Sequence, residues 1–394
     1  MARRSPEALV DAPILYWARS SAGFSIEEAA ARLQVKPETV RAWESEEARP
    51  SMSQLRAMAT AYKRLLSDFY LPAAPDEPPM PHDLRRLPGE VALTYSRSLR
   101  HQLRLARQRR ELALDFAADL EAEVPALRAH LDLIGDAEAK GAEIRRLLRI
   151  DLAMQRSWRD PRQSYNGWRA ALERAGVLVF QITGVATTEV LGFSLSDRPF
   201  PVIGVNRKLA PNGRTFTLLH ELVHVLLEES SICDIDEGAE RPAEEQRVEV
   251  VCNAVAAATL VPRDALLSEA LVAAHPARPR DWSDDELSSL ARAFGVSQEV
   301  ILRRLLTFGR TSRAFYAARR AAFGRLFDAP APVDLDAEYR RNMPREVISD
   351  LGKPFTRLVL DSYANAFTSL SDVTRHLGLR AQQVAKVREM LAGE

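Results

Sequence analysis

The first 71 residues repeat short apolar stripes between helix-start signals, and this pattern predicts five short helices. The apolar face of the first consists of Leu9, Ile14, Leu15 and Ala18. Ser25 and Glu28 form a capping box that opens the second helix, and Pro37 suits the first position of the third. Ser53 is the expected cap of the fourth.

The pattern changes twice beyond this segment. Residues 72–82 hold five prolines in eleven positions, which is typical of a semi-rigid linker. Long helices follow, first over about 93–122 and then over 137–158. Short β-branched and aromatic runs between Gly, Pro and Asp then predict strands at 176–183, 190–195 and 200–205. Helical periodicity returns at 215–228, 243–260, 284–306, 312–327 and 345–391.

These elements predict an α+β, mainly helical protein with several domains. The expected parts are a five-helix domain (1–71), a Pro-rich linker with an Arg-rich helical connector (72–160), a domain of strands and helices that contains the histidine motif described below (161–275), a helical region resembling a helix-turn-helix (276–329) and a C-terminal helical region (330–394). The helix-turn-helix pattern at 287–304 favours a structural role, and residues 370–384 show a weaker third pattern of this kind.

The overall composition mainly excludes certain classes of protein. The 394 residues carry 54 basic and 54 acidic side chains, so net charge gives no general case for binding nucleic acid or an anionic membrane. Two cysteines, Cys233 and Cys252, are too few for a disulfide framework and suit a reducing compartment. Without a clean signal peptide or an uncharged span of membrane length, we expect a cytoplasmic protein with no membrane partner.

The most informative stretch contains His220, Glu221 and His224. Two histidines four positions apart lie on one face of a helix, so both imidazoles can reach one cation. Glu221 projects about 100° away from His220 and can act on a water molecule without ligating the metal. Two core histidines beside a salt-bridged Glu are the alternative, but burying these groups without a metal would be costly.

A catalytic zinc needs a third protein ligand, and the next helix offers Glu249. It lies 25 residues after His224 in an apolar stretch, and Asn253 follows one turn later on the same face. By spacing alone, Glu249 is equally well the last solvent-facing acid of a charged run.

The chain here resembles the ImmA/IrrE metallo-endopeptidases. Their pattern matches Val202-Ile-Gly-Val-Asn206, then Arg214-Thr-Phe-Thr-Leu-Leu-His220-Glu-Leu-Val-His224, then the helix from Glu249 to Pro262. The resemblance covers about 165–270 and departs at three positions, Val223, Cys252 and Val255, none of them a ligand. It implies a zincin fold, Zn²⁺ held by His220, His224 and Glu249, Glu221 as general base, and a protein substrate that is typically a DNA-binding repressor. Cys233, in the intervening loop, is an unremarkable thiol or a redox or zinc-occluding switch.

Residues 12–71 resemble an Xre/Cro-type helix-turn-helix, which implies a DNA partner. By analogy the recognition helix is 37–45, and the residues expected to face the major groove are Lys36, Glu38, Thr39 and Arg41. Residues 1–71 nevertheless hold ten basic against nine acidic side chains, which limits counterion release. Either a homodimer presents the few basic groups together, or this module chiefly contacts protein.

The connector is more basic, with eight arginines against two acids over residues 81–110. Four of these arginines recur on one helical face: Arg97, Arg100, Arg104 and Arg107. The stripe is a solvated charged face or a phosphate-binding strip.

Together these features predict a regulatory zinc endopeptidase coupled to DNA binding, which cleaves a repressor-type protein in a stress, mobile-element or toxin–antitoxin response. The rival hypothesis is a transcriptional regulator or antitoxin whose zinc domain only binds a partner. A weaker third is a nucleic-acid sensor whose peptidase is activated when DNA occupies the arginine strip.

Overall fold

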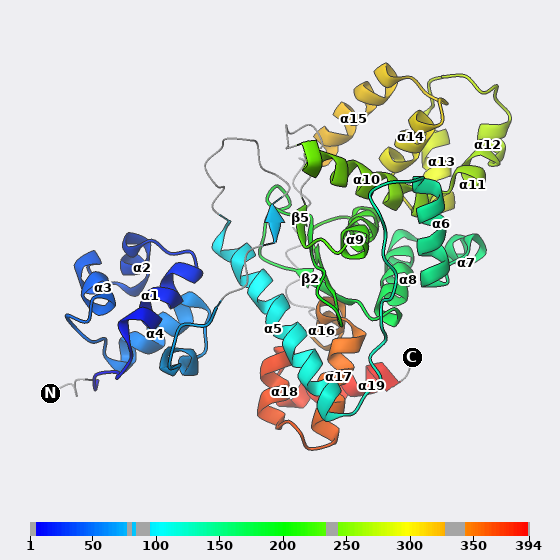
Figure 1. Cartoon of the computed structure of the whole chain (residues 1–394). Coiled ribbons are helices and arrows are strands. Elements are labelled where there is room, and N and C mark those ends of the chain that lie inside the picture. Colours follow the sequence, from blue (N-terminus) through cyan, green and yellow to red (C-terminus); the bar gives the residue numbers. More distant parts are fainter. Residues whose placement is uncertain (1–4, 77–80, 84–94, 234–242, 328–342, 393–394) are drawn as a thin grey trace. The chain divides into compact units, whose positions relative to one another are not determined.

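The computed structural model describes residues 5–76, 81–83, 95–233, 243–327 and 343–392 (Figure 1). Its contacts divide the chain into two compact units. The first comprises residues 1–80 and 91–107, and the second comprises 81–90 and 108–394.

The first unit contains four α-helices and one 3₁₀ helix among its described residues before position 77. They are α1 (Ala12–Ser21), α2 (Ile26–Leu33), α3 (Pro37–Glu44), α4 (Met52–Tyr62) and η1 (Leu66–Tyr70). The capping box of Ser25 and Glu28 is confirmed, as is Pro37 at the first position of α3. The core of this unit gathers apolar side chains from all five helices, among them Ile14, Ala30, Trp43, Leu55 and Phe69.

Two details of the prediction for this unit were wrong. Leu9 precedes α1 and is 70% exposed, because the helix begins only after Asp11. The cap of α4 is Ser51, whose side chain and that of Gln54 bond each other's backbone N–H groups. Ser53 lies inside the helix instead. Both Ser51 and Ser53 precede an apolar stripe, and only Ser51 has Gln three positions later.

Long helices follow the linker, as predicted, although one of them is broken. Helix α5 (Arg97–Asp119) begins in the first unit and ends in the second. The predicted helix over 137–158 is two helices, α6 (Ala137–Leu148) and α7 (Leu152–Ser157). Arg149 adopts a left-handed conformation (φ 54°) after α6, and the side chain of Asp151 caps α7, so the helix ends and restarts there.

A five-stranded mixed sheet lies at the centre of the second unit, in the order β1-β5-β3-β4-β2. Its strands are β1 (His82–Asp83), β2 (Leu178–Ile182), β3 (Gly192–Leu195), β4 (Val202–Asn206) and β5 (Ser231–Cys233). Strand β4 pairs in parallel with β2 and antiparallel with β3, which in turn pairs antiparallel with β5. The three predicted strands are confirmed, whereas β1 and β5 were missed because each is too short to show a pattern.

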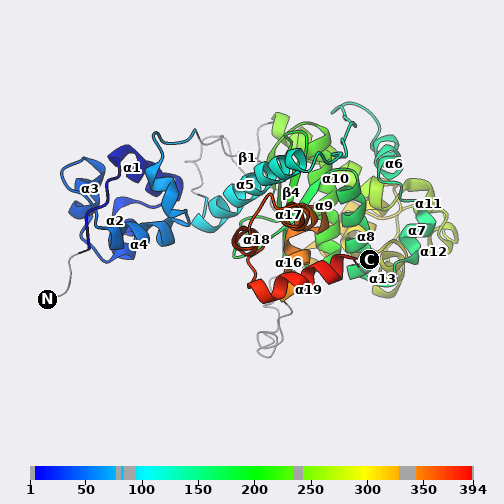
Figure 2. The same ribbon diagram turned by 90° about the horizontal axis from the view of Figure 1, so that it is seen from below.

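Helices cover both faces of this sheet. Helices α8 (Pro161–Arg174) and α9 (Pro211–Leu226) share a core with Val179 and Ile203 on one face. On the other, Phe180 lies edge-on against Phe355 with ring centroids 5.8 Å apart. Phe355 belongs to α17 (Lys353–Ala364), which lies with α16 (Met343–Leu351) on the side of the sheet away from α9 (Figures 1 and 2). Helix α10 (Ala243–Leu260) packs against α9 and α6.

The remaining described helices complete the mainly helical α+β fold. They are α11 (Arg263–Leu267), α12 (Ala270–Ala273), α13 (Asp284–Phe294), α14 (Gln298–Thr307), α15 (Arg313–Phe327), α18 (Leu370–Leu377) and α19 (Ala381–Ala392). The turn between α13 and α14 uses Gly295 at φ 65°, as a tight helix-turn-helix requires. Leu287, Phe294 and Leu305 of this pair lie in the main core of the unit. No helix in the described part of the chain has the length and apolar character needed to cross a membrane.

Candidate metal centre

Helix α9 carries the two histidines of the predicted site. Pro211 occupies its first turn, and the helix is buried nearly all round from Thr217 to Leu226. His220 is 6% exposed and His224 is fully buried. Their Nε2 atoms face each other at 3.2 Å, so the one-face geometry expected from a spacing of four is confirmed.

Helix α10 brings Glu249 to the same point. One carboxylate oxygen lies 3.1 Å from His224 Nε2, and the other lies 3.5 Å from His220 Nε2. Glu249 is only 7% exposed, although it follows a charged run in the sequence. The three side chains offer ligand atoms that all lie within 4.8 Å of one another. The alternative of a solvent-facing acid at position 249 was therefore wrong.

These separations fit a tetrahedral zinc ion. Zn–N bonds of 2.0–2.1 Å at tetrahedral angles place two ligand nitrogens about 3.3 Å apart. The observed Nε2–Nε2 distance is 3.2 Å, and the carboxylate oxygens of Glu249 lie at comparable distances from the two nitrogens. Two imidazoles and one carboxylate also form a donor set that zinc prefers.

Asn253 orients the first histidine. Its side-chain oxygen lies 3.1 Å from Nδ1 of His220, one turn along α10 from Glu249. An amide oxygen accepts only from a protonated Nδ1, so the neutral imidazole keeps its lone pair on Nε2, which faces His224 and Glu249. A metal-ligating histidine commonly has such a partner. The sequence predicted only that Asn253 lies on the same helical face as Glu249, and it predicted no role for this residue.

The electrostatic interactions within this cluster favour a charged Glu249 carboxylate next to positively charged groups. Burial by itself would raise the pKa of Glu249, but the adjacent imidazoles of His220 and His224 more than offset it, and the pKa falls far below its usual range. Burial would lower the pKa of His220, whereas the nearby Glu249 carboxylate raises it overall. The carboxylate is thus ionised and available as a ligand, and the pocket favours positive charge.

Glu221 points toward the sheet side of α9 and is fully buried. Ser231 Oγ of β5 donates a 3.0 Å hydrogen bond to Glu221 Oε2, and Ser194 Oγ of β3 lies 2.9 Å from Ser231 Oγ. Gly192 allows this close approach of sheet and helix. A Cβ there would lie 2.9 Å from Glu221 Oε1 and 2.6 Å from Thr217 Cγ2. Sequence reasoning missed both serines, because Ser231 lies on β5, which is too short to be recognised, and the contact of Ser194 depends on the pairing of β3 with β5.

Other residues singled out in the sequence lie as follows. Val223 is fully buried in the main core. Cys252 is fully buried in that core, and burial raises the pKa of its thiol well above the usual value. Cys233 ends β5, and its side chain lies outside the described residues.

The residues predicted to face DNA belong to the first unit. Lys36, Glu38 and Arg41 are exposed, and Thr39 is half-buried, at or near the start of α3. Arg41 forms ion pairs with Glu27 at 2.7 Å and with Glu38 at 3.7 Å. The positive charge of the predicted recognition helix is therefore partly neutralised by its own neighbours.

The arginines at the start of α5 make contacts within the first unit. Arg97 pairs with Glu28 at 2.8 Å and lies over the ring of Phe24. Arg104 donates to the backbone carbonyls of Tyr62 and Lys63 at the end of α4. Arg100 donates a 3.4 Å hydrogen bond to the carbonyl of Tyr95.

Comparison with known protein families gives two matches. Residues 172–306 match the IrrE N-terminal-like domain, a peptidase family, and residues 15–69 match a helix-turn-helix domain. No curated protein matches the chain significantly. The chain therefore carries an N-terminal helix-turn-helix domain, which implies DNA binding, and an IrrE N-terminal-like domain of metallopeptidase type with a buried His-His-Glu cluster.

Proposed function

We propose that this protein is a regulatory zinc endopeptidase coupled to DNA binding, which cleaves a repressor-type protein. The observation that carries the proposal is the convergence of His220, His224 and Glu249 within 4.8 Å, with Glu221 next to a ligand on the same helix. The three donors would hold the metal and leave a position for water or substrate.

The roles of the side chains follow from their surroundings. When bound, zinc supplies a Lewis acid that makes water more acidic and polarises a peptide carbonyl. Glu221 accepts a proton from the attacking water at its carboxylate and delivers it to the leaving amine. Ser231 holds Oε2 of that carboxylate at 3.0 Å, so the base reaches the reaction already oriented. Asn253 holds the ring of His220 in the tautomer that a metal needs.

The repressor substrate is proposed from two features. A helix-turn-helix domain in the same chain places the protease within transcriptional regulation. The family resemblance at the metal site implies a DNA-binding protein as the usual substrate.

Replacing Glu221 with Gln provides the test. The variant keeps the ligands and the shape of the side chain but lacks the general base, so it should bind its substrate without cleaving it. Recovered from cells under the inducing stress, full-length Glu221→Gln protein should carry an intact repressor, and wild-type cells should contain two fragments of that repressor. Recovery of the same fragments with both proteins would overturn the proposal.

One observation favours a second candidate function, a DNA-binding regulator or antitoxin with a non-catalytic zinc domain. Glu221 is fully buried and bonded to Ser231, so it has a structural role that a non-catalytic domain would also retain. In that case output depends on DNA occupancy, and wild type and Glu221→Gln would repress a target promoter equally.

A further inference from the structure

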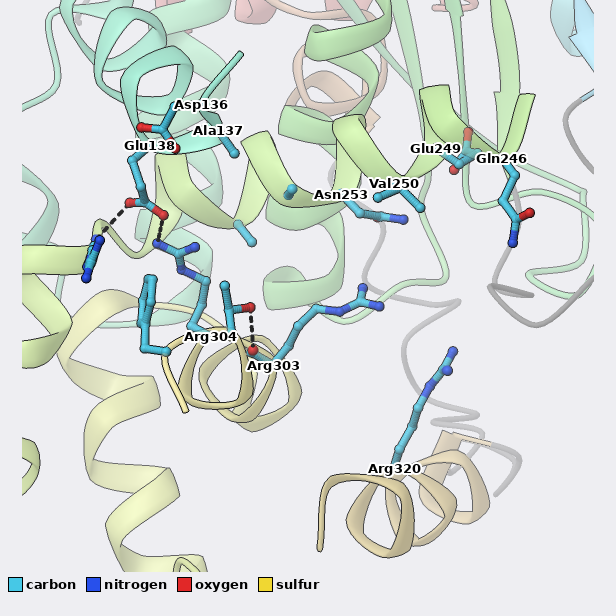
Figure 3. Close-up of a pocket in the computed structure, with 15 residues that line it drawn as sticks. Asp136, Ala137, Glu138, Gln246, Glu249, Val250, Asn253, Arg303, Arg304 and Arg320 are labelled. Carbon is cyan, nitrogen blue, oxygen red and sulfur yellow. Dashed lines mark hydrogen bonds and ion pairs between the residues drawn. The ribbon is translucent and has the colours of Figure 1, made fainter. Parts of the chain in front are cut away.

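A cavity of about 790 Å³ opens beside the metal cluster in the second unit. Glu249 and Asn253 of α10 lie in its wall, so the cavity reaches the site where peptide cleavage is proposed. Its opposite wall comes from α14 and α15, and its far end from the start of α6 and from Arg263 (Figure 3).

The wall formed by α10 is long enough for an extended peptide. Its lining positions run from Gln246 to Ala257. Eleven helical steps of about 1.5 Å cover about 16 Å. An extended chain rises about 3.3 Å per residue, so about five residues fit along this wall.

An aliphatic side chain is exposed on this wall, one position after the metal ligand Glu249. Val250 is 61% exposed and lies between Gln246 and Asn253 on the cavity side of α10 (Figure 3). Other aliphatic side chains of the same helix are directed into the core, and Val248 is only 3% exposed. Water therefore meets apolar surface directly beside the metal cluster, and covering that surface with another apolar group is favourable.

Small side chains extend this apolar surface along the cavity. Ala254 and Ala257 also line it, and their spacings of four and then three from Val250 place all three in one row on the helix. The two methyl groups leave space in front of the helix for a branched side chain of a ligand. Ala137 and Phe308 add apolar surface elsewhere in the cavity.

Charged groups at the far end of the cavity are bound to partners within the chain. Glu138 accepts a hydrogen bond of 2.6 Å from Arg304 and another from the backbone N–H of Arg263. Arg304 also donates to the carbonyl of Val261, and Asp136 caps the start of α6. These charges have their partners already, and so the row on α10 is the surface that a ligand would cover.

We propose that Val250, Ala254 and Ala257 form a subsite for an aliphatic side chain, Leu, Ile or Val, of a polypeptide substrate. This inference rests on the proposed function and adds its substrate class. The three positions lie about 1.5 to 12 Å beyond Glu249 along the helix axis, so the selected side chain belongs to a residue within about four positions of the scissile bond.

Binding is measured first, because it does not depend on cleavage. Zinc-loaded, full-length Glu221→Gln protein is titrated with two rhodamine-labelled random peptide pools that are identical except that one contains Leu where the other contains Asn. We expect the Leu pool to bind about tenfold more tightly, because an aliphatic side chain leaves water for the apolar row. The preference should persist from about 0.15 M to about 1 M salt, since salt screens charges and does not weaken apolar contacts.

Two further substitutions in the Glu221→Gln protein test the row itself. Val250→Asp should remove the preference for the Leu pool, because a charge replaces the apolar surface. Ala254→Leu should narrow the space, so that a pool with Ala in place of Leu binds more tightly than the Leu pool. The matched control is Ile134→Asp, which changes an aliphatic side chain that is 82% exposed and does not line the cavity, and it should leave the preference intact.

Zinc content is measured for each protein, so that loss of metal is separated from loss of the subsite. If Val250→Asp has lost zinc, Ala254→Leu decides. Equal binding of the Leu and Asn pools to the parent protein overturns the proposal, as does a preference for Leu that survives both substitutions.

Cleavage then separates this inference from the proposed function. Protein with wild-type Glu221 is incubated with peptides from a digested bacterial proteome, and the cut sites are read by mass spectrometry. Aliphatic residues should be enriched at one position relative to the cuts, and Ala254→Leu should shift that enrichment to Ala. Cleavage without aliphatic enrichment overturns the subsite and leaves the peptidase standing. Leu-selective binding without cleavage supports the subsite and overturns the peptidase.

A second copy of this chain is the competing occupant, because exposed apolar surface also forms interfaces between protein molecules. Sedimentation of the Glu221→Gln protein with and without Val250→Asp provides the test. Oligomers that dissociate on this substitution, together with equal binding of the Leu and Asn pools, would overturn the proposal. An oligomeric state that the substitution leaves unchanged agrees with it, provided that the substitution abolishes the preference for the Leu pool.

Discussion

Ser231 Oγ donates a hydrogen bond of 3.0 Å to Glu221 Oε2, which connects the proposed general base to strand β5 of the central sheet. Ser194 of β3 lies 2.9 Å from the same hydroxyl, so the connection continues across the sheet. The orientation of Glu221 thus depends on two strands as well as on its own helix.

Replacing Ser231 with Ala should slow peptide cleavage while leaving zinc content unchanged. The expected loss in kcat is about ten- to a hundredfold, because a misplaced catalytic group is costly. Initial rates on a peptide mixture, with metal analysis of the same samples, provide the measurement. Ser196→Ala is the control, since Ser196 bonds Ser230 and no described contact joins it to Glu221. A wild-type rate for Ser231→Ala would show that this bond does not position the base.

The ligand set predicts one zinc ion per chain. His220→Ala or Glu249→Ala should empty the site, since zinc would keep only two protein ligands. Glu221→Gln should bind a full equivalent of zinc. Elemental analysis of the purified full-length proteins distinguishes these outcomes, and undiminished zinc in Glu249→Ala would rule out the third ligand.

Replacing Asn253 should lower the affinity of the site for zinc, whereas the site should still fill when zinc is in excess. Replacing it with Ala removes the acceptor that fixes the His220 tautomer, and zinc affinity should fall about ten- to a hundredfold. Asn253→Asp keeps an oxygen acceptor and should restore most of the affinity. Competition with a zinc chelator gives both values. If the Ala and Asp variants bind zinc equally, hydrogen bonding to Nδ1 is not the cause.

DNA binding by the first unit can be measured through its salt dependence. If the arginine face of α5 contacts phosphates, replacing Arg97, Arg100, Arg104 and Arg107 together with Ala should reduce the salt slope by nearly one for each lost contact. Arg97 and Arg104 already bond groups of the first unit, so a smaller reduction than four is expected. A slope equal to that of wild type would identify the strip as a solvated, structural face.

Prediction from sequence succeeded where residue spacing determines geometry. A spacing of four fixes His220 and His224 on one face of a helix, so that half of the centre followed directly. The position of Glu249 beside the two histidines depends on how α10 packs against α9. From spacing alone, a metal ligand at this position could not be distinguished from a surface acid. Only the resemblance to a known family identified it as a ligand.

The missed features depend on contacts between distant segments. Strand β5 has three residues, too few for an apolar period, and so the partnership of Ser231 with Glu221 had no local signal. The break after α6 depends on a single left-handed residue, Arg149, where residues other than glycine are uncommon.

The central claim is that Glu221 promotes zinc-dependent cleavage of a protein. The most direct measurement compares newly created protein N-termini in cells that express, at equal levels, either wild type or Glu221→Gln under several stresses. The account predicts at least one internal N-terminus, in a DNA-binding repressor, that appears with wild type and is absent with Glu221→Gln, and that disappears when zinc is chelated. Identical sets of N-termini from the two strains under every stress would contradict it.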